Sequence, residues 1–297
     1  MKSKEEYSIQ IISHIMLGIL SLLVLIPFTL LFISSFTSQD EILQTGYSLM
    51  PKSFSLSAYE YLWKQKDQIF NAYGVTIIVT LIGTTCNVFV SSLFAYPLSR
   101  RDLPGCKALT FFVFFTMLFN GGLVPTYLIY THYLGIKNTL IALLVPSLLM
   151  SPWYVLLMRT FFLNNIPVAI IESVRLDGAN EIVIYSKIIL PMGKNIIATV
   201  CLFAGIAYWN DWYNGMLYLT DHRFFSIQNL LQRMLSNIQY LKNISQMGGT
   251  VDEAAANIPS TTVRMSIAVI GVFPIMLLYP LLQKNFVKGI AVGAVKG

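Results

Sequence analysis

Residues 70–97 read FNAYGVTIIVTLIGTTCNVFVSSLFAYP, a stretch without a single Asp, Glu, Lys or Arg. A helix that crosses a membrane needs about 20 largely apolar residues, because each adds about 1.5 Å across an apolar layer of roughly 30 Å. Lipid offers no hydrogen-bond partners, so such a stretch is expected to be helical. Five further stretches are similarly apolar, namely 10–36, 109–131, 139–158, 195–217 and 265–283, and Asp211 is the one Asp, Glu, Lys or Arg within them. The sequence therefore predicts an all-α, polytopic membrane protein with six transmembrane helices in a single transmembrane domain over residues 1–297.

Composition excludes several other classes of protein. Of the 297 residues, 55% are hydrophobic and only 11% are charged, and the mean hydropathy is +0.64. A soluble chain carries roughly 25% charged residues, so a soluble enzyme, a disordered protein and a secreted disulfide scaffold are excluded. The net charge of +6 is typical of a basic membrane face, so no nucleic-acid partner is expected. The three cysteines are scattered and form no metal or disulfide motif.

The distribution of Lys and Arg predicts the orientation in the membrane. With the N-terminus inside, the inner segments carry 12 basic and 6 acidic residues, whereas the outer segments carry 8 and 7. The first span is too long for a signal peptide and is kept as a mature helix. We therefore expect a multi-pass membrane protein with both termini in the cytoplasm. The inner segments are 1–9, 98–108, 159–194 and 284–297, and the outer segments are 37–69, 132–138 and 218–264.

Two outer segments are longer than simple connections. In 218–264, apolar residues recur at helical spacing, which predicts an amphipathic helix on the membrane surface or over the outer mouth of the bundle. Residues 248–257 after it are expected to form a flexible loop. The 37–69 segment holds an aromatic cluster at the outer headgroup level, and interfacial anchoring would account for both segments. The apolar residues of the helix are Ile227, Leu230, Leu231, Met234, Leu235, Ile238 and Leu241.

The predicted cytoplasmic stretch 165–191 reads NIPVAIIESVRLDGANEIVIYSKIILP. It predicts a short helix, a sharp turn and a second helix. We expect Asn165 to cap the first helix, with Pro167 in its opening turn. Gly178 permits the left-handed backbone that closes a helix, and Asp177 is expected to accept amide hydrogen bonds at the start of the next one. Pro191 is expected to separate this unit from the fifth span.

One side of the first of these helices is apolar. Ile170, Ile171 and Val174 lie on it, while Glu172 and Arg175 point elsewhere. A compact helical pair with an apolar face offers a docking surface for another protein. The alternative is a helix that lies flat on the inner leaflet.

The same stretch resembles the EAA loop of binding-protein-dependent ABC importer permeases. The family pattern is Glu-Ala-Ala-x-x-Asp-Gly-Ala, then an aromatic residue, then Ile-x-Leu-Pro, at the offsets found here. Ser173 and Val174 replace the two alanines. The resemblance implies a cytoplasmic helix-turn-helix that couples the permease to an ATPase. It places the coupling role on Glu172, Ser173, Asp177, Gly178, Ala179, Tyr185, Leu190 and Pro191.

The resemblance extends over nearly the whole chain and implies a set of partners. Residues 95–100 resemble the family's Ala-Tyr-Ala-Leu-Ser-Arg, with Pro97 in place of the second alanine. Residues 120–127 and 209–212 are similar to members that import oligosaccharides or related solutes, and the tail 289–297 is similar to that of the maltose-type group. The resemblance also implies a bacterial cell membrane. In this family two homologous permease subunits pair, two ATP-binding cassette ATPase subunits dock below them, and an extracellular solute-binding protein delivers the small-molecule solute. Membrane lipid surrounds the assembly. The tail is also implied to reach the ATPase pair.

The chain lacks the motifs that would let it work alone. No Gly-x-x-x-x-Gly-Lys-Ser/Thr phosphate loop occurs, so no cofactor is expected in this chain, and ATP and Mg would bind to the partner ATPases. No His-Glu-x-x-His occurs and the three histidines are dispersed, which leaves an intramembrane hydrolase without a catalytic set or a metal site. The chain is therefore expected to be a transporter subunit and not an enzyme.

Ionisable groups inside a membrane suggest a solute pathway. Asp211 lies near the outer end of the fifth span and is flanked by aromatic and amide side chains. Aromatic faces stack on sugar rings while amides and carboxylates bond to hydroxyls, so these residues favour a carbohydrate, and the family resemblance implies an oligosaccharide. An ordinary aromatic belt is the alternative. The pathway candidates are Trp209, Asn210, Asp211, Trp212 and Tyr213.

Other functions stay open at this point. The solute could instead be a peptide or another non-sugar compound. An ion-coupled secondary transporter would need paired charges at mid-membrane or broken half-helices in repeated halves, and a membrane scaffold would transport nothing. The sequence favours a permease that converts ATPase closure into alternating access.

Overall fold

The structure is a computed structural model that describes residues 4–246 and 261–277. These residues form helices, and their β structure is limited to an isolated antiparallel bridge between Thr37 and Phe54. The predicted all-α class is thereby confirmed. Contacts divide the chain into two compact units, residues 1–66 with 233–275 and residues 67–232 with 276–297. The assignment of the whole chain to a single permease domain stays a prediction.

The first unit contains the helix predicted over 10–36. Helix α1 (Lys4–Ser35) carries large exposed apolar side chains along its length, as a helix surrounded by lipid would. Near its end, the Ser266 hydroxyl donates to the Ser35 carbonyl oxygen at 3.3 Å. A helix over Thr261–Leu277 covers part of the predicted span 265–283. The remainder of that span, the 248–257 loop and the 289–297 tail lie outside the described residues.

In the segment that follows α1, the carboxylate of Glu41 holds the backbone around residues 52–53 by hydrogen bonds. Helix α2 (Gln39–Thr45) and helix α3 (Ser57–Trp63) flank an irregular stretch. The Glu41 carboxylate accepts hydrogen bonds from the backbone N–H groups of Lys52, at 2.7 Å, and Ser53, at 2.6 Å. The hydroxyl of Ser53 also donates to Glu41 and is the largest cause of the lowered pKa of this carboxyl. The interfacial position of this segment stays a prediction.

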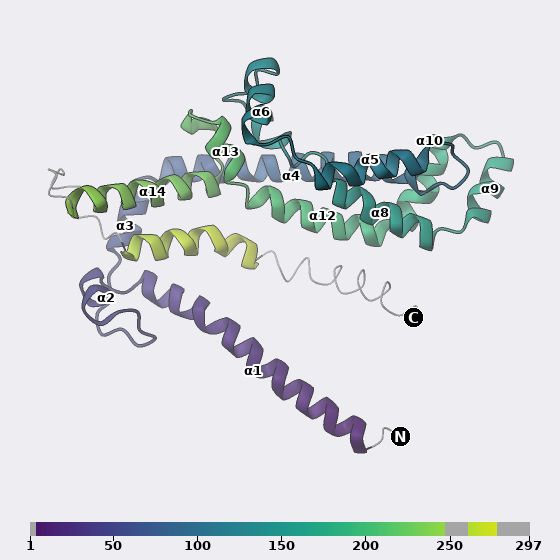
Figure 1. Cartoon of the computed structure of the whole chain (residues 1–297). Helices are drawn as coiled ribbons and strands as arrows, with labels where there is room; N and C mark the ends of the chain where they lie inside the picture. The colour runs from purple at the N-terminus through teal and green to yellow at the C-terminus, as the bar shows by residue number, and fades with distance from the viewer. Residues whose placement is uncertain (1–3, 247–260, 278–297) are drawn as a thin grey trace. The chain divides into compact units, whose positions relative to one another are not determined.

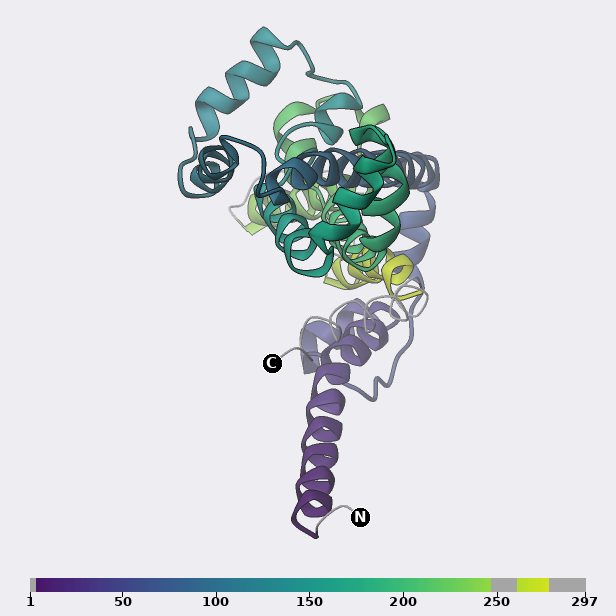
Figure 2. The same ribbon diagram turned by 90° about the vertical axis from the view of Figure 1, so that its right-hand side faces the viewer.

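The second unit is built around helices α4 (Lys66–Ser99), α8 (Pro152–Asn165) and α12 (Lys194–Trp209). Their buried cluster includes Ala95 from α4, Met158 from α8 and Val200 from α12. Helices α4 and α12 approach closely, because a Cβ at Gly83 would lie 2.5 Å from the ring of Tyr208. Figures 1 and 2 show this unit in blue, teal and green.

Three of the predicted spans are not single continuous helices, which corrects the sequence prediction. Span 109–131 is broken near Gly122, whose φ is +88°, and the two parts meet at 108°. Span 139–158 is interrupted between Pro146 and Ser151, with Ser147 at a φ of +62°. Span 195–217 is interrupted at 210–212. The pieces are α5 (Cys106–Leu118), α6 (Leu123–Leu128), the π-helix η1 (Ile129–Tyr133), α7 (Ile141–Leu144), α8, α12 and α13 (Tyr213–Tyr218).

The count of six spans is neither confirmed nor refuted. Two helical stretches, Ile9–Ser35 and Lys66–Ser99, are long and apolar enough to cross a membrane. Three bent helix pairs each pass the same test when taken together. These findings refer to the described residues, and the total of six stays a prediction.

The predicted amphipathic helix is confirmed as α14 (Ile227–Gln246). It begins in the second unit after a short 3-10 helix η3 (His222–Phe224), and its first amide, that of Ile227, donates to the Thr76 hydroxyl at 2.7 Å. Five of the seven predicted apolar residues are buried, and Leu235 and Leu241 are half-buried. The helix therefore buries its apolar face within the protein.

Candidate functional site

The predicted helix-turn-helix is present in the second unit. Helix α9 (Val168–Leu176) is followed by α10 (Glu181–Ile184), the π-helix η2 (Tyr185–Ile189) and α11 (Leu190–Met192). We call residues 168–192 the elbow. Helix α9 meets α8 at 79°, and the helical run that ends at Met192 meets α12 at 80°. Gly193 lies at that second bend, so Pro191 is inside the last turn of the elbow and the separation from the fifth span falls two residues later.

The turn of the elbow has the hydrogen bonds of a Schellman motif. The N–H of Gly178 donates to the Arg175 carbonyl at 3.0 Å, and the N–H of Ala179 donates to the Val174 carbonyl at 3.2 Å. Gly178 has a φ of +84°, as the sequence predicts. Val174 and Ala179 both pack against the buried cluster, which is the apolar contact that usually accompanies this motif.

The capping predictions for the elbow are wrong in detail. Asn165 ends α8, where its side chain donates to the Phe161 carbonyl, and Pro167 precedes α9 instead of lying in its first turn. Asp177 is the C-cap residue that directly follows α9. Asn180 caps the second helix, because its side-chain oxygen accepts the Val183 N–H at 2.9 Å. The predicted side-chain cap of the second helix therefore exists three residues further along, at Asn180 instead of Asp177, whereas α9 has no side-chain cap at its start.

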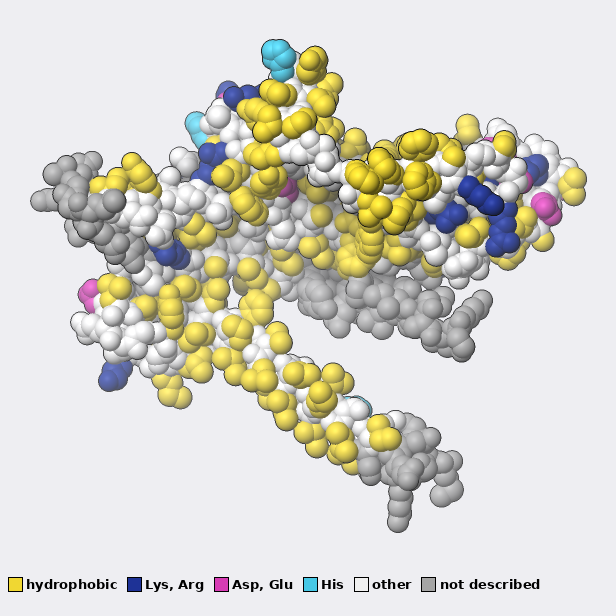
Figure 3. All heavy atoms as spheres, viewed as in Figure 1, with side chains coloured by type: hydrophobic (Ala, Val, Ile, Leu, Met, Phe, Trp, Pro, Cys, Tyr) yellow, Lys and Arg dark blue, Asp and Glu magenta, His cyan; other side chains and the backbone are white. Residues whose placement is uncertain are grey.

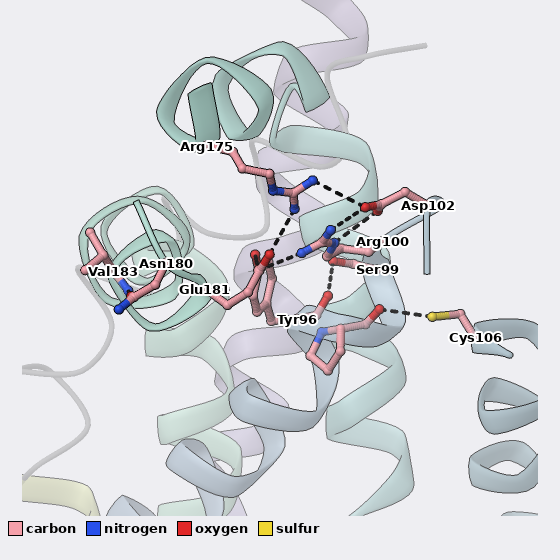
Figure 4. A network of polar contacts seen from close by, with 10 residues as sticks. Tyr96, Ser99, Arg100, Asp102, Cys106, Arg175, Asn180, Glu181 and Val183 are labelled. Carbon is pink, nitrogen blue, oxygen red and sulfur yellow. Dashed lines mark hydrogen bonds and ion pairs between the residues drawn. The ribbon is translucent and has the colours of Figure 1, made fainter. Parts of the chain in front are cut away.

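Four charged side chains form a closed ring beside the elbow (Figure 4). Arg100 contacts Asp102 and also lies 2.6 Å from a Glu181 carboxylate oxygen. Arg175 lies 3.0 Å from the other Glu181 oxygen and 3.5 Å from Asp102. Positive and negative groups alternate around this ring, which we call the charge ring. The Tyr96 hydroxyl donates to Glu181 at 2.6 Å and adds α4 to the same network.

The electrostatics of the charge ring follow from this geometry. The guanidinium of Arg100 lowers the pKa of the Asp102 carboxyl to about 2. Arg100 is likewise the largest cause that lowers the pKa of Glu181, and the Tyr96 hydroxyl adds to it. Pairing with Asp102 raises the pKa of Arg100. The side chain of Arg100 is 8% exposed, whereas those of Asp102 and Glu181 are about half exposed. The ring therefore has one buried cation held by two solvent-facing carboxylates.

The charge ring adds a polar attachment to α9, which has no fully buried residue and packs against the buried cluster through Ile171 and Val174. Its Arg175 reaches across to the end of α4 and to α10. Behind the ring, the Tyr185 hydroxyl is 2.7 Å from the Ser92 hydroxyl, and both side chains are buried. The second helix of the elbow is thus anchored to α4 through both apolar and polar contacts.

The predicted coupling residues differ in how exposed their side chains are. Tyr185 is buried, Ala179 and Leu190 are half-buried, and the others are exposed, namely Glu172, Ser173, Asp177, Gly178 and Pro191. Sequence reasoning missed Leu176 and Ile182, whose apolar side chains are 89% and 76% exposed at the tip of the elbow. It also missed the charge ring. Nothing local in the sequence links Arg100 to Glu181.

The predicted solute-pathway residues gather at the break between α12 and α13. One Asp211 oxygen accepts the Asn214 N–H at 3.1 Å, while the other is buried with no hydrogen-bond partner among the described residues. The Trp209 indole N–H is also buried without such a partner. Trp212 and Tyr213 are 40% and 47% exposed and their rings meet edge to face at 5.8 Å. Asn210 is exposed and donates back to its own helix.

A family model matches residues 106–292, which is more than half of the chain, and describes a binding-protein-dependent transport system inner membrane component. The chain belongs to this family. The family resemblance seen in residues 172–191 is thereby confirmed, and the chain is an inner-membrane transport component.

Individual relatives of this inner-membrane component agree with the family. The polygalacturonan/rhamnogalacturonan transport system permease protein YtcP of Bacillus subtilis is 37% identical over 278 residues, covering 93% of this chain and 94% of YtcP. The trehalose/maltose transport system permease protein MalG of Thermococcus litoralis is 28% identical and covers 99% of both chains.

A solved structure has the same fold. It belongs to a bacterial ABC transporter involved in the import of the acidic polysaccharide alginate. The TM-score is 0.78 at 27% identity, and the match covers 96% of this chain and 99% of that one. The likeness therefore extends over the whole inner-membrane component.

Proposed function

We propose that this chain is the membrane-spanning permease subunit of an ATP-driven importer for a carbohydrate. Its relatives include a permease named for polygalacturonan, one named for trehalose and maltose, and a chain of an alginate importer. All of these names refer to saccharides, which supports an oligosaccharide as the proposed solute. A non-sugar solute such as a peptide is the second candidate, and an ion-coupled transporter is the third.

The elbow is proposed to receive the movement of the ATPase and the charge ring to pass it on to α4. The single observation that carries this proposal is Glu181, which accepts from Tyr96 of α4 and pairs with Arg175 of α9. The exposed residues Glu172, Asp177 and Gly178 would sit in the partner, with Leu176 and Ile182 as apolar anchors at the tip.

The working assembly is proposed to contain a second homologous permease subunit, two ATPase subunits that bind ATP and Mg, and an extracellular solute-binding protein. Both termini of this chain would face the cytoplasm. At the outer side, the unpartnered Asp211 oxygen and the exposed rings of Trp212 and Tyr213 would contact solute. A carboxylate accepts sugar hydroxyls and aromatic rings cover the apolar faces of sugars, which supports this role.

The test is reconstitution of the full complex in proteoliposomes without an ion gradient. We expect ATP-dependent uptake of an oligosaccharide from a panel of neutral sugars, acidic sugars and peptides. Glu172→Gln and Gly178→Ala are expected to uncouple ATP hydrolysis from uptake or to release the ATPase. Normal transport and retained ATPase in both variants would refute the coupling role, and uptake that requires an ion gradient would refute ATP-driven import.

A further inference from the structure

A second polar feature lies next to the charge ring, in the second unit. A pocket of about 530 Å³ is bounded by the end of α4, the connection to α5 and the middle of α8. Two side-chain contacts build it. The Cys106 sulfhydryl donates to the Pro97 carbonyl at 3.3 Å, and the Arg159 Nε donates to the Leu98 carbonyl at 2.9 Å. The three elements therefore hold the walls of this pocket in place.

The lining of the pocket carries four cations and no carboxylate. Arg100, Arg101, Lys107 and Arg159 contribute to it. Arg100 is already paired with Asp102 and Glu181, but Arg101, Lys107 and Arg159 make no ion pair within residues 4–246 and 261–277. Three uncompensated positive charges around one pocket favour an anion with several oxygen acceptors, and a phosphate group fits this description.

The surroundings of the pocket are apolar. Leu98, Leu103 and Leu163 complete its lining. Helix α5 starts at the pocket and has no buried residue, with Phe111 and Phe112 about 60% exposed. Figure 3 shows Lys and Arg side chains beside the hydrophobic surface over α5. A phosphate site that continues into an exposed apolar helix matches a molecule with a charged head and hydrocarbon chains.

We propose that this pocket binds the headgroup of an anionic phospholipid, whose acyl chains lie along α5. Charge complementarity selects this occupant over a zwitterionic lipid, because the ammonium of the latter would face the same three cations. Basic pockets between membrane helices are known to hold such headgroups. The site shares Arg100 with the charge ring, so a bound lipid would also fix the end of α4 beside the elbow.

The test uses the complete purified complex and phosphatidylglycerol as the probe. Native mass spectrometry in a mild detergent measures its apparent affinity for the complex. We expect Arg101→Gln with Lys107→Gln to weaken binding roughly 25-fold, a factor of about five for each cation removed near an anionic lipid. The matched control is Lys64→Gln with Lys137→Gln, which removes the same charge from two exposed positions outside the pocket and should leave the affinity unchanged.

Two further arms separate the possible explanations. Arg101→Lys with Lys107→Arg keeps both charges and should retain the lipid, which shows that the loss does not come from misfolding. Phosphatidylcholine and excess inorganic phosphate should not displace phosphatidylglycerol. Equal affinity in the charge-removing and wild-type proteins, an equal loss in the matched control, or displacement by inorganic phosphate would each overturn the proposal.

Discussion

Replacement of Glu181 by Gln removes the negative charge that joins α9, α10 and α4, while it preserves the size of the side chain. The carboxylate pairs with Arg100 at 2.6 Å and with Arg175 at 3.0 Å, and it accepts the Tyr96 hydroxyl at 2.6 Å. Because Glu181 is about half exposed, each pair is counted at the upper end for solvated ion pairs, about 1 kcal/mol. The amide oxygen of Gln can keep one acceptor role, so the attachment of α9 should weaken by about 1–2 kcal/mol.

Hydrogen exchange reports this change directly. A loss of about 1–2 kcal/mol in the cost of local opening should speed exchange of the amides of residues 168–176 roughly 5- to 30-fold. In proteoliposomes, the Glu181→Gln complex should consume more ATP for each solute molecule imported, because α9 follows the ATPase without moving α4. The same substitution at Glu41, which also accepts several hydrogen bonds, should affect the 38–55 segment and leave α9 unchanged. Unaltered exchange in α9 together with an unaltered ATP-to-solute ratio would refute the role of the charge ring.

Three further predictions concern packing, the turn and pH. Gly83→Ala should destabilise the protein by about 1–3 kcal/mol through overpacking, because the new methyl group would meet the Tyr208 ring. Gly74→Ala, in the same helix but with open space around it, should be neutral or stabilising by up to about 1 kcal/mol in the same thermal unfolding assay, because Ala favours a helix over Gly. Gly178→Ala should cost about 1 kcal/mol from left-handed backbone strain alone, since no neighbour lies within 4 Å, and a neutral result would refute the Schellman turn. The folded-state pKa of Asp102 is lowered to about 2, so the stabilisation that it provides is complete above its unfolded pKa of about 4 and is lost as pH falls towards 2. Unfolding temperatures measured across this range should therefore fall, and a flat profile would contradict the ion pairing.

The sequence was sufficient where a local pattern decides the structure. An uncharged run predicts α4, helical spacing of apolar residues predicts α14, and Gly178 predicts the left-handed turn. In each case the cause lies within a few consecutive residues: partitioning into lipid, burial of one helix face, or the steric freedom of glycine.

The sequence was insufficient where the structure depends on the direction that the backbone takes at a break or on contacts between residues far apart in the chain. The hydrophobicity of residues 109–131 predicts that they prefer lipid, but it does not predict the sharp turn of the backbone near Gly122. The charge ring joins residues 100 and 102 to residues 175 and 181, and only the packing of α4 against the elbow brings them together. The shift of the cap from Asp177 to Asn180 has a local origin instead, because Gly178 and Ala179 complete the Schellman turn before the second helix begins.

The strict alternation of sign in the charge ring has a consequence for how this protein can change over evolutionary time. Exchanging the charges of Arg175 and Glu181 would keep the attraction between these two positions. It would also set a carboxylate at position 175 against Asp102 and a guanidinium at position 181 against Arg100. A compensated replacement would have to alter all four positions together, or remove the ring altogether in favour of apolar side chains. We expect the quartet to be inherited as a block, so that a permease lacking any one of the four lacks most of the others.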